Sequence, residues 1–428
     1  MRLLHTSDWH LGRSLHRADL RDAQAAYLDH LVQTVRAEKI DAVLVAGDVY
    51  DRAIPPLDAV KMFESALVRI RETGARVVLI SGNHDSAQRL GFSSQLLDAS
   101  GVHLRTRVAE TAQPVLLQDR HGPVAVYGIP YLEPEAVADA LPPDPAAVPG
   151  VDAPAPCGHA GVLGRATSCI RADATRRGVR SVVLAHGWVH GGAPSDSERD
   201  ITVGGVGAVS AELFSDFSYT ALGHLHGPQV IRPELRYSGS PLPYSFSEAG
   251  HRKGSWLVEL GRDGLARVEH VPAPVHRRLS TLRGPLDELL RAPEHGARTG
   301  DFVSITLTDA ARPTDAMARL AVRFPHLLVL SWEPEGAVDD GLTYSSRLRG
   351  RNDVEVAASF VRHVRGTEAS DGERRLLMAA MQHARTRDAE PAVTSDGVAA
   401  APLHLPAPLP GGVGDGERDA PASERGAA

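Results

Sequence analysis

Eight polar side chains between positions 8 and 226 have the types that bind divalent metal ions. They are Asp8, His10, Asp48, Asn83, His84, His186, His224 and His226. Carboxylates, neutral imidazoles and one amide oxygen suit borderline cations such as manganese, iron or zinc better than they suit calcium. The set is large enough to hold two metal ions.

Four of these candidates form two pairs, Asp8–His10 and His224–His226, each with one residue between its members. In an extended segment, side chains two residues apart point to the same side of the chain. Each pair is therefore predicted to chelate a metal ion, with Trp9 and Leu225 turned away from it.

Asp48 is the candidate for a carboxylate that bridges two cations. Gly47 before it lets the backbone approach its neighbours closely, and a shared carboxylate offsets the repulsion between cations ~3.5–4 Å apart. Two such ions lower the pKa of bound water, supply hydroxide near neutral pH and neutralise charge at a phosphorus centre. The predicted chemistry is in-line hydrolysis of a phosphoester.

Short apolar runs precede most of these polar residues. They are rich in Val, Ile and Leu without polar alternation, as in strands that are covered on both faces. The runs are residues 3–4, 42–46, 77–80, 124–127 and 182–185. Helical spacing of apolar residues over 22–38 and 57–72 completes the pattern of an α/β sandwich. Because ligands bind beyond the carboxyl ends of strands in α/β sheets, the polar groups are predicted to converge there.

Each motif has an ordinary structural explanation when it is taken alone. A Gly-Asp pair after a strand is common turn chemistry, and twenty histidines will produce some pairs two residues apart by chance. Several such motifs in order, each after a separate apolar run, favour a catalytic centre over these explanations.

The chain divides by pattern into four parts. Residues 1–270 carry the sandwich pattern and all the candidate ligands, and residues 274–346 form a smaller α/β unit. Its expected strands are 278–282, 302–307 and 327–331, and its expected helices are 285–290 and 314–324. Residues 353–385 are predicted to form two helices with apolar stripes, the second opened by a capping box at its start. Residues 386–428 are dominated by Pro, Gly and Ala and are predicted to be disordered.

Composition narrows the class of protein. A chain of 428 residues, 43% hydrophobic and 23% charged, fits two or three globular domains. The net charge of −7 gives no general sign of nucleic-acid binding, so any DNA contact must be local. Cys157 and Cys169 are too few for a zinc ribbon or a disulfide framework. Without an apolar run of ~18 residues or a signal peptide, the protein is expected to be soluble and cytoplasmic. The Pro-rich segment 141–156 is expected to be a loop.

Five motifs together resemble the calcineurin-like metallophosphoesterase superfamily. They are Asp-x-His at 8–10, Gly-Asp-x-x-Asp at 47–51, Gly-Asn-His-Asp at 82–85, the single His186, and Gly-His-x-His at 223–226. Three segments further resemble the nuclease subunits of bacterial SbcCD complexes. These are Leu-Leu-His-Thr-Ser-Asp-Trp-His-Leu-Gly at 3–12, Gly-Asp-Val-Tyr-Asp at 47–51 followed by Pro55-Pro56, and Tyr-Ser-Gly-Ser-Pro at 237–241. The resemblance covers the chain except for the Pro-rich loop and the C-terminal tail.

The resemblance implies a role for each candidate. One metal ion, by implication manganese, would be held by Asp8, His10, Asp48 and His226, and a second by Asp48, Asn83, His186 and His224. His84 would contact the phosphate and help to protonate the leaving 3′ oxygen, with Asp85 or Asp51 holding its imidazole. The alternative is that His84 only braces Asn83.

The resemblance also implies an activity and a partner. The activity is an ATP-stimulated exonuclease on double-stranded DNA ends, usually 3′ to 5′, with single-strand endonuclease cutting and hairpin opening, in repair, replication and recombination. Residues 274–346 would cap the DNA. Residues 353–385 would engage an SbcC-type, SMC-like ATPase in a nucleoid-associated heterotetramer that contains a dimer of nuclease subunits.

Three other interpretations stay open at this point. The first is a small-substrate phosphodiesterase or phosphatase of the same superfamily, which needs neither a capping unit nor exposed helices. The second is a scaffold that recruits DNA and an ATPase without cutting. The third concerns single features: the apolar stripes of the two helices could form an intramolecular core, and Arg13, Arg17 and Arg21 could be solvated instead of touching phosphates.

Overall fold

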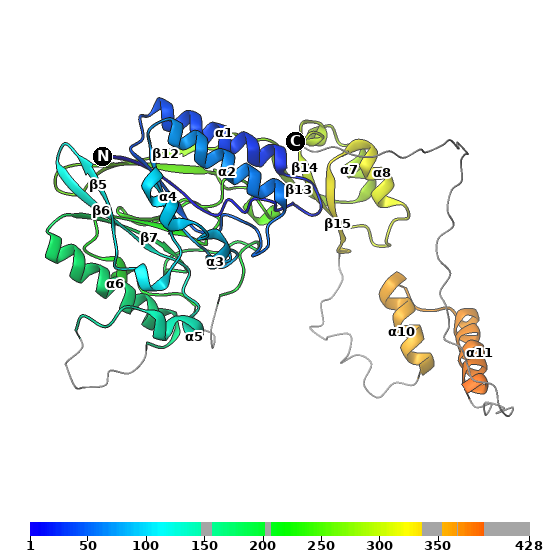
Figure 1. The fold of residues 1–428 in the computed structure, drawn as a ribbon. Helices are drawn as coiled ribbons and strands as arrows, with labels where there is room; N and C mark the ends of the chain where they lie inside the picture. Colours follow the sequence, from blue (N-terminus) through cyan, green and yellow to red (C-terminus); the bar gives the residue numbers. More distant parts are fainter. Residues whose placement is uncertain (147–155, 202–206, 336–352, 366, 389–428) are drawn as a thin grey trace, which may run out of the picture. The chain divides into compact units, whose positions relative to one another are not determined.

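The computed structural model describes residues 1–146, 156–201, 207–335, 353–365 and 367–388. Two six-stranded sheets pack against each other, and helices cover their outer faces (Figure 1). The predicted α/β sandwich flanked by helices is thereby confirmed. Among the described residues, no helix combines the length and the apolar character that crossing a membrane requires.

The elements have the following bounds. The strands are β1 (Arg2–Thr6), β2 (Ala42–Ala46), β3 (Arg76–Ile80), β4 (Val102–Arg105), β5 (Val115–Asp119), β6 (Gly122–Ile129), β7 (Arg180–His186), β8 (Tyr219–Gly223), β9 (Gln229–Arg232), β10 (Leu235–Tyr237), β11 (Gly254–Leu260), β12 (Leu265–Pro272), β13 (Leu279–Gly284), β14 (Phe302–Leu307) and β15 (Leu327–Trp332). The helices are α1 (Arg21–Ala37), α2 (Leu57–Glu72), α3 (Ala87–Leu90), α4 (Ser94–Ser100), α5 (Pro134–Val137), α6 (Gly158–Arg177), α7 (Leu286–Arg291), α8 (Ala316–Arg323), α10 (Asp353–Arg365) and α11 (Asp371–Asp388).

Both large sheets have a parallel centre, with antiparallel strands at one edge of the first sheet and at both edges of the second. The first has the order β12-β11-β1-β2-β3-β4, in which β1 to β4 run parallel. The second has the order β5-β6-β7-β8-β10-β9, in which β6, β7, β8 and β10 run parallel. The carboxyl ends of the central strands are therefore the natural place for a site.

Three apolar layers hold the sandwich together. Between the sheets, side chains such as Leu44 and Leu184 are fully buried, so the strands carry apolar residues on both faces. Tyr27 and Phe63 belong to the layer under α1 and α2, and Ile170 belongs to the layer under α6. These layers account for the continuous apolar runs in the sequence.

A small parallel sheet, β13-β14-β15, follows the sandwich, with α7 and α8 packed on it. All five elements expected between 278 and 331 form. Leu289, Val303 and Phe324 belong to its own apolar core, and Phe302 packs in a second cluster with Leu15 of the sandwich. The small sheet is thus joined to the loop that follows β1.

Helices α10 and α11 belong to a separate compact unit that begins at Gly341. They pack against each other, and Ser370 and Glu373 exchange the hydrogen bonds of the predicted capping box. Apolar side chains nevertheless remain exposed: Phe360 by 55%, Leu376 by 71% and Met378 by 46%. The side chain of Val364 and most of the predicted 141–156 loop and 386–428 tail lie outside the described residues, although α11 itself continues to 388.

His5 lies at the centre of the sandwich and is fully buried. Its Nδ1 lies 2.9 Å from the Tyr219 hydroxyl and its Nε2 lies 3.1 Å from the Leu222 carbonyl oxygen. Burial lowers the pKa of His5 to about 3 from its ordinary value of 6.5. Between these two pKa values, the imidazole is neutral in the folded protein but protonated in the unfolded chain.

This histidine is expected to make stability depend on pH. Below pH 6.5 the unfolded chain binds a proton at His5 that the folded protein does not, so stability rises with pH between about 4 and 6.5. The contribution to the free energy of unfolding is about 1.4 kcal/mol per pH unit. Denaturant unfolding at several pH values, in chelator, should give a slope shallower by that amount for His5→Gln. Parallel slopes for the two proteins would contradict the assignment.

Candidate metal centre

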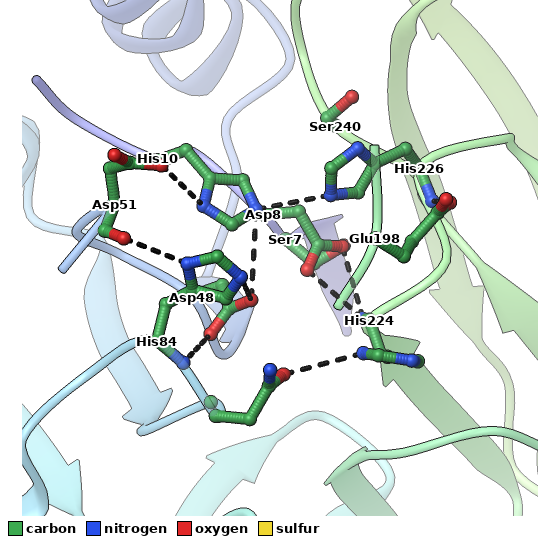
Figure 2. A network of polar contacts seen from close by, with 12 residues as sticks. Ser7, Asp8, His10, Asp48, Asp51, His84, Glu198, His224, His226 and Ser240 are labelled. Carbon is green, nitrogen blue, oxygen red and sulfur yellow. Dashed lines mark hydrogen bonds and ion pairs between the residues drawn. The ribbon is translucent and has the colours of Figure 1, made fainter. Parts of the chain in front are cut away.

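The predicted ligands all follow the carboxyl ends of central strands, as the sequence suggests. Asp8 and His10 follow β1, Asp48 follows β2, Asn83 and His84 follow β3, His186 ends β7, and His224 and His226 follow β8. Figure 2 shows Asp8, His10, Asp48, His84, His224 and His226 directed toward one another. The structure thus brings together residues from both sheets that are more than two hundred positions apart in the sequence.

Asp48 occupies the middle of the cluster. Its Oδ2 lies 3.5 Å from His186 Nε2, 3.6 Å from His10 Nε2 and 4.0 Å from His84 Nε2. Its Oδ1 accepts a hydrogen bond of 2.8 Å from the backbone N–H of His84. No other carboxylate of the described residues contacts imidazoles from three strands in this way, so Asp48 has the position that a bridging ligand requires.

Two glycines make this close packing possible. A Cβ atom on Gly47 would lie 2.3 Å from Nδ1 of His186, and one on Gly82 would lie 2.1 Å from Oδ1 of Asp48. Gly47 also has a φ of +89°, in the left-handed region that favours glycine. Both positions therefore exclude any larger residue while the ligands keep this geometry.

The predicted extended conformation of the two ligand pairs is wrong. Asp8, His10 and His224 have φ values of 53°, 44° and 104°, which are left-handed. The chain turns sharply where each strand ends, and His10 N–H donates to the Asp48 carbonyl oxygen at 3.0 Å. The side chains still converge, because this turning, rather than strand alternation, directs them inward. Left-handed non-glycine residues of this kind cluster at functional sites.

The hydrogen bonds of His186 show that the site presents lone pairs to its centre. Its Nδ1 lies 2.9 Å from the Ala46 carbonyl oxygen, which can only accept, so Nδ1 carries the proton. Its Nε2 is then a lone pair that faces Asn83 Oδ1 at 2.9 Å and Asp48 Oδ2 at 3.5 Å. Acceptors that face one another in this way form a site that a bound cation would satisfy.

The opposite side of the site repeats this arrangement. His10 Nε2 and His226 Nε2 lie 3.0 Å apart. The Nδ1 of His226 contacts the Ser197 hydroxyl and lies 3.5 Å from a carboxylate oxygen of Glu248, which can only accept. Nε2 of His226 is therefore left as the lone pair. Asp8, whose Oδ1 accepts from the backbone N–H of His224 at 3.0 Å, completes the group.

The electrostatics of the site favour metal binding. Burial, followed by the charges of neighbouring histidines, lowers the pKa of His10 and His224, so both imidazoles are neutral and able to ligate. Burial, followed by the charge of Asp48, raises the pKa of Asp8. A bound divalent cation would stabilise the ionised carboxylate and offset this repulsion. Within the part of the chain that the structure describes, three clusters, all buried, have ligand atoms within 4.8 Å of one another. They are Asp8–His10–His226, His10–Asp48–His84 and Asp8–Asp48–His186.

His84 is held by Asp51, one of the two predicted residues, although by its backbone and not by its carboxylate. Its Nδ1 lies 2.7 Å from the backbone carbonyl oxygen of Asp51, so neither the Asp85 nor the Asp51 carboxylate holds the ring. The Asp85 carboxylate instead accepts backbone N–H groups from Gly82, Val49 and Tyr50. Burial, followed by the charge of Asp48, raises the pKa of Asp85 to about 7. Asp85 thus shapes the loops around the site and does not orient the imidazole.

The three arginines after the first motif have different surroundings. Arg21 pairs with Asp19 and Asp58 at the surface. Arg13 donates to the Ser197 carbonyl oxygen at 2.8 Å, and its guanidinium lies over the Tyr244 ring. Their contacts are therefore with the protein itself, and no contact is described for the side chain of Arg17, which is exposed.

Sequence reasoning missed the residues that surround His226. Glu198 accepts the His226 backbone N–H at 2.6 Å, and Ser197 and Glu248 contact its ring. Lys253 donates to the His226 carbonyl oxygen at 2.8 Å. None of them belongs to a spaced motif, but Lys253 is one of only three lysines in the chain, and that rarity was the one available signal.

Comparison with protein families gives two matches. A model described as calcineurin-like phosphoesterase matches residues 1–228, more than half of the chain. A second, SbcD_C, described as the type 5 capsule protein repressor C-terminal domain, matches residues 275–365. The first match contains every candidate ligand, and the second contains the small parallel sheet and α10.

Several solved structures are similar at low sequence identity. The protein TT1561 of Thermus thermophilus is 13% identical, with 63% of this chain and 98% of that chain covered and a TM-score of 0.34. A dimetal phosphatase from Danio rerio is 12% identical, with coverage of 64% and 99% and a TM-score of 0.37. GAP50 of Plasmodium, described as the anchor in the inner membrane complex, is 10% identical, with coverage of 78% and 98% and a TM-score of 0.35.

Proposed function

Because the chain belongs to the calcineurin-like phosphoesterase family and is therefore a metal-dependent hydrolase, we propose that it is the nuclease subunit of an SbcCD-type complex. The observation that carries the proposal is the inward-facing set of lone pairs around Asp48, on a chain that also matches an SbcD C-terminal domain. The substrate would be the phosphodiester backbone of DNA at double-strand ends, single strands and hairpins.

The residues present fit two divalent cations, which we propose to be Mn²⁺. Asp8, His10, Asp48 and His226 would hold one, and Asp48, Asn83, His186 and His224 would hold the other. Divalent ions at such a site supply Lewis acidity that polarises the phosphoester and activates water. The chain's own contribution is to keep the protons of His186 and His226 on their outward nitrogens, where the Ala46 carbonyl oxygen and the Ser197–Glu248 pair accept them.

His84 is proposed as the group that contacts the phosphate and that, as an imidazolium with its second proton on Nε2, protonates the leaving 3′ oxygen. Its Nδ1 is held by the Asp51 carbonyl oxygen, so its Nε2 is directed toward the cluster, 4.0 Å from Asp48 Oδ2. A positioned imidazole of this kind contributes a factor of ~10²–10⁴ to a reaction rate. This assignment separates His84 from the metal ligands on either side of it.

The experiment that tests the function compares substrates on one preparation. Purified protein with Mn²⁺ should cut labelled duplex ends and hairpins, and chelator should abolish the cutting. Hydrolysis of p-nitrophenyl phosphodiesters or phosphomonoesters without any cutting of DNA would favour the small-substrate enzyme. No metal-dependent hydrolysis of any substrate would favour the scaffold.

The two C-terminal helices are proposed to bind the ATPase partner. Phe360 of α10 and Leu376 of α11 are 55% and 71% exposed, although the helices pack on each other. An intramolecular core therefore does not account for all of their apolar residues. Residues 274–346, which include the small sheet, are proposed to cap the DNA.

Charged substitutions on these helices should separate partner binding from hydrolysis. Phe360→Glu combined with Leu376→Glu should abolish co-purification with a co-expressed SbcC-type ATPase, because a buried unpaired charge opposes docking. Hydrolysis of a p-nitrophenyl phosphodiester should stay within about twofold of the parent, as expected for surface changes. The matched control is Val322→Glu on α8, where the parent residue is 87% exposed. Retained binding by the double variant would contradict the proposal.

A second copy of the chain is proposed to cover the apolar groove between α2 and α4. This groove has a volume of about 980 Å³, and Phe92, Leu96 and Val68 beside it are exposed by 78%, 77% and 52%. Light scattering should give twice the 45.6 kDa chain mass for the parent, and Phe92→Asp should give one chain mass. Val230→Asp on β9, where the parent residue is 53% exposed, should remain dimeric. A monomeric parent would refute this interface.

A further inference from the structure

Lys253 is a buried ammonium placed directly behind the metal centre. Its side chain is 8% exposed, and it stands immediately before β11. Its Nζ donates to the His226 carbonyl oxygen at 2.8 Å, to the Ser240 hydroxyl at 2.9 Å and to the carboxylate of Glu248. An ammonium has three donors, so these acceptors satisfy all of them.

Glu248 connects this ammonium to the ring of His226. Its side chain is fully buried, and its Oε1 accepts from the Ser197 hydroxyl at 2.5 Å and from the Tyr244 backbone N–H at 3.3 Å. The same oxygen lies 3.5 Å from His226 Nδ1. Lys253 therefore reaches His226 twice, once at its backbone carbonyl and once through the carboxylate behind its imidazole.

A buried ion pair needs a reason, because it contributes little stability by itself. Taking two charges out of water is unfavourable, and apolar residues of similar volume often stabilise a fold as well or better. Apolar residues cannot present a hydrogen-bond acceptor to Nδ1 of a histidine, and they cannot donate a hydrogen bond to its backbone carbonyl oxygen. Hydrogen-bond partners of this kind set the orientation of metal-ligating histidines, and their loss weakens metal affinity by about 10–100-fold.

We propose that Lys253 and Glu248 are positioning residues that hold His226 in the orientation in which its Nε2 faces His10 and the first metal ion. This inference rests on the proposed metal centre, and it assigns a role to two residues outside every recognised motif. Neither residue touches substrate. They act only through His226, and their effect is confined to the ion that His226 would bind.

The test measures Mn²⁺ binding by calorimetry and by the electron paramagnetic resonance signal of bound Mn²⁺, on the full-length protein. Lys253→Met should lower the affinity for one of the two Mn²⁺ ions by about 10–100-fold. The affinity for the other ion should stay within about twofold of the parent. Glu248→Gln, which keeps the shape of the side chain, should do the same and serves if Lys253→Met does not fold. At a Mn²⁺ concentration that fills both sites of the parent, the resonance spectrum of each variant should resemble that of a single bound Mn²⁺ ion.

Arg180→Met is the matched control. Arg180 and Asp119 form an ion pair with side chains only 8% and 9% exposed, at the start of the strand that ends in His186. Six residues of strand place that pair about 20 Å from the metal centre. The control should lower the melting temperature without changing the affinity for either ion.

Each outcome has one meaning. If Lys253→Met and Glu248→Gln melt earlier but bind both ions like the parent, the pair is structural and the inference is overturned. If both variants lose the affinity for both ions equally, they disturb the whole centre, and the specific role at His226 is likewise overturned. If the parent itself binds no Mn²⁺, the proposed metal centre fails, which the parent measurement reveals independently of any variant.

Discussion

Asp48→Ala is expected to abolish metal-dependent hydrolysis. The substitution removes a carboxylate that lies 3.5–4.0 Å from His10, His84 and His186 together. Loss of the shared ligand removes several kcal/mol of charge stabilisation, which corresponds to a fall in kcat of about a thousandfold or more. The measurement is cleavage of a labelled duplex with Mn²⁺, beside the Mn²⁺ stoichiometry of the same preparation.

The same variant should behave differently in the absence of metal. The charge of Asp48 contributes to raising the pKa of Asp8 and Asp85, so the three carboxylates repel one another in the empty protein. Asp48→Ala relieves this repulsion and is expected to melt in chelator at a temperature close to that of the parent. Mn²⁺ should raise the melting temperature of the parent, since a ligand at a hundred times its Kd stabilises by about 2.7 kcal/mol. The variant should show little of this shift.

Asp173→Ala is the control for burial of a carboxylate. Asp173 is 4% exposed, pairs with Arg176 and Arg177, and accepts from the Tyr127 hydroxyl on the outer side of the second sheet. Its loss should lower the melting temperature but leave Mn²⁺ stoichiometry and cleavage intact. Full Mn²⁺ binding and normal cleavage by Asp48→Ala would remove Asp48 from the centre, and with it the two-metal interpretation.

His84→Gln is expected to slow DNA cleavage while leaving metal binding unchanged. If Nε2 of His84 protonates the leaving 3′ oxygen, kcat on DNA should fall by ~10²–10⁴. A p-nitrophenyl phosphodiester has a leaving group that is stable without a proton. The substitution should therefore slow its hydrolysis by a factor at least about ten times smaller than the factor for DNA cleavage. Mn²⁺ stoichiometry should remain that of the parent.

This comparison distinguishes three roles of His84. If His84 is a metal ligand, as its grouping with His10 and Asp48 would allow, the variant should bind Mn²⁺ more weakly. A residue that only braces Asn83 would slow both substrates equally. If His84 is the acid that protonates the leaving group, its substitution should slow DNA cleavage more than hydrolysis of the p-nitrophenyl phosphodiester. His103→Gln is the control and should change none of these quantities, because His103 is a buried histidine of β4 that is hydrogen-bonded to Asp98 of α4.

The pH profile of the parent supplies an independent check on His84. Burial lowers the pKa of His84, opposed by the charge of Asp48 and the hydrogen bond to Asp51. An acid must be protonated to act, so kcat on DNA should fall as pH rises through the pKa of this residue. His84→Gln should lose that decline. A profile of the same shape for both proteins would assign the titration to another group.

The strongest periodic segments were predictable from local sequence. Residues 42–46 and 57–72 form the expected strand and helix without a change of boundary, because each has a continuous apolar run or stripe that local pattern determines. The strands β4, β5 and β8 to β12 were not assigned, since each mixes polar with apolar residues and is defined by its pairing with other strands. β11, for example, pairs with β1, which lies at the start of the chain.

The sequence by itself determined which residue types gather at this site. Six of the eight ligand-type side chains follow apolar runs that the sequence shows, and parallel strands in one sheet must end at the same edge, so convergence within each sheet could be expected without knowledge of long-range contacts. The tertiary structure decided how the ligands are held. The left-handed turns at Asp8 and His10, the carbonyl oxygen that orients His84, and the Lys253–Glu248 pair behind His226 depend on segments that meet only when the chain has folded. Hydrogen bonds between such segments leave no period or spacing in the sequence, and for that reason only the folded arrangement reveals them.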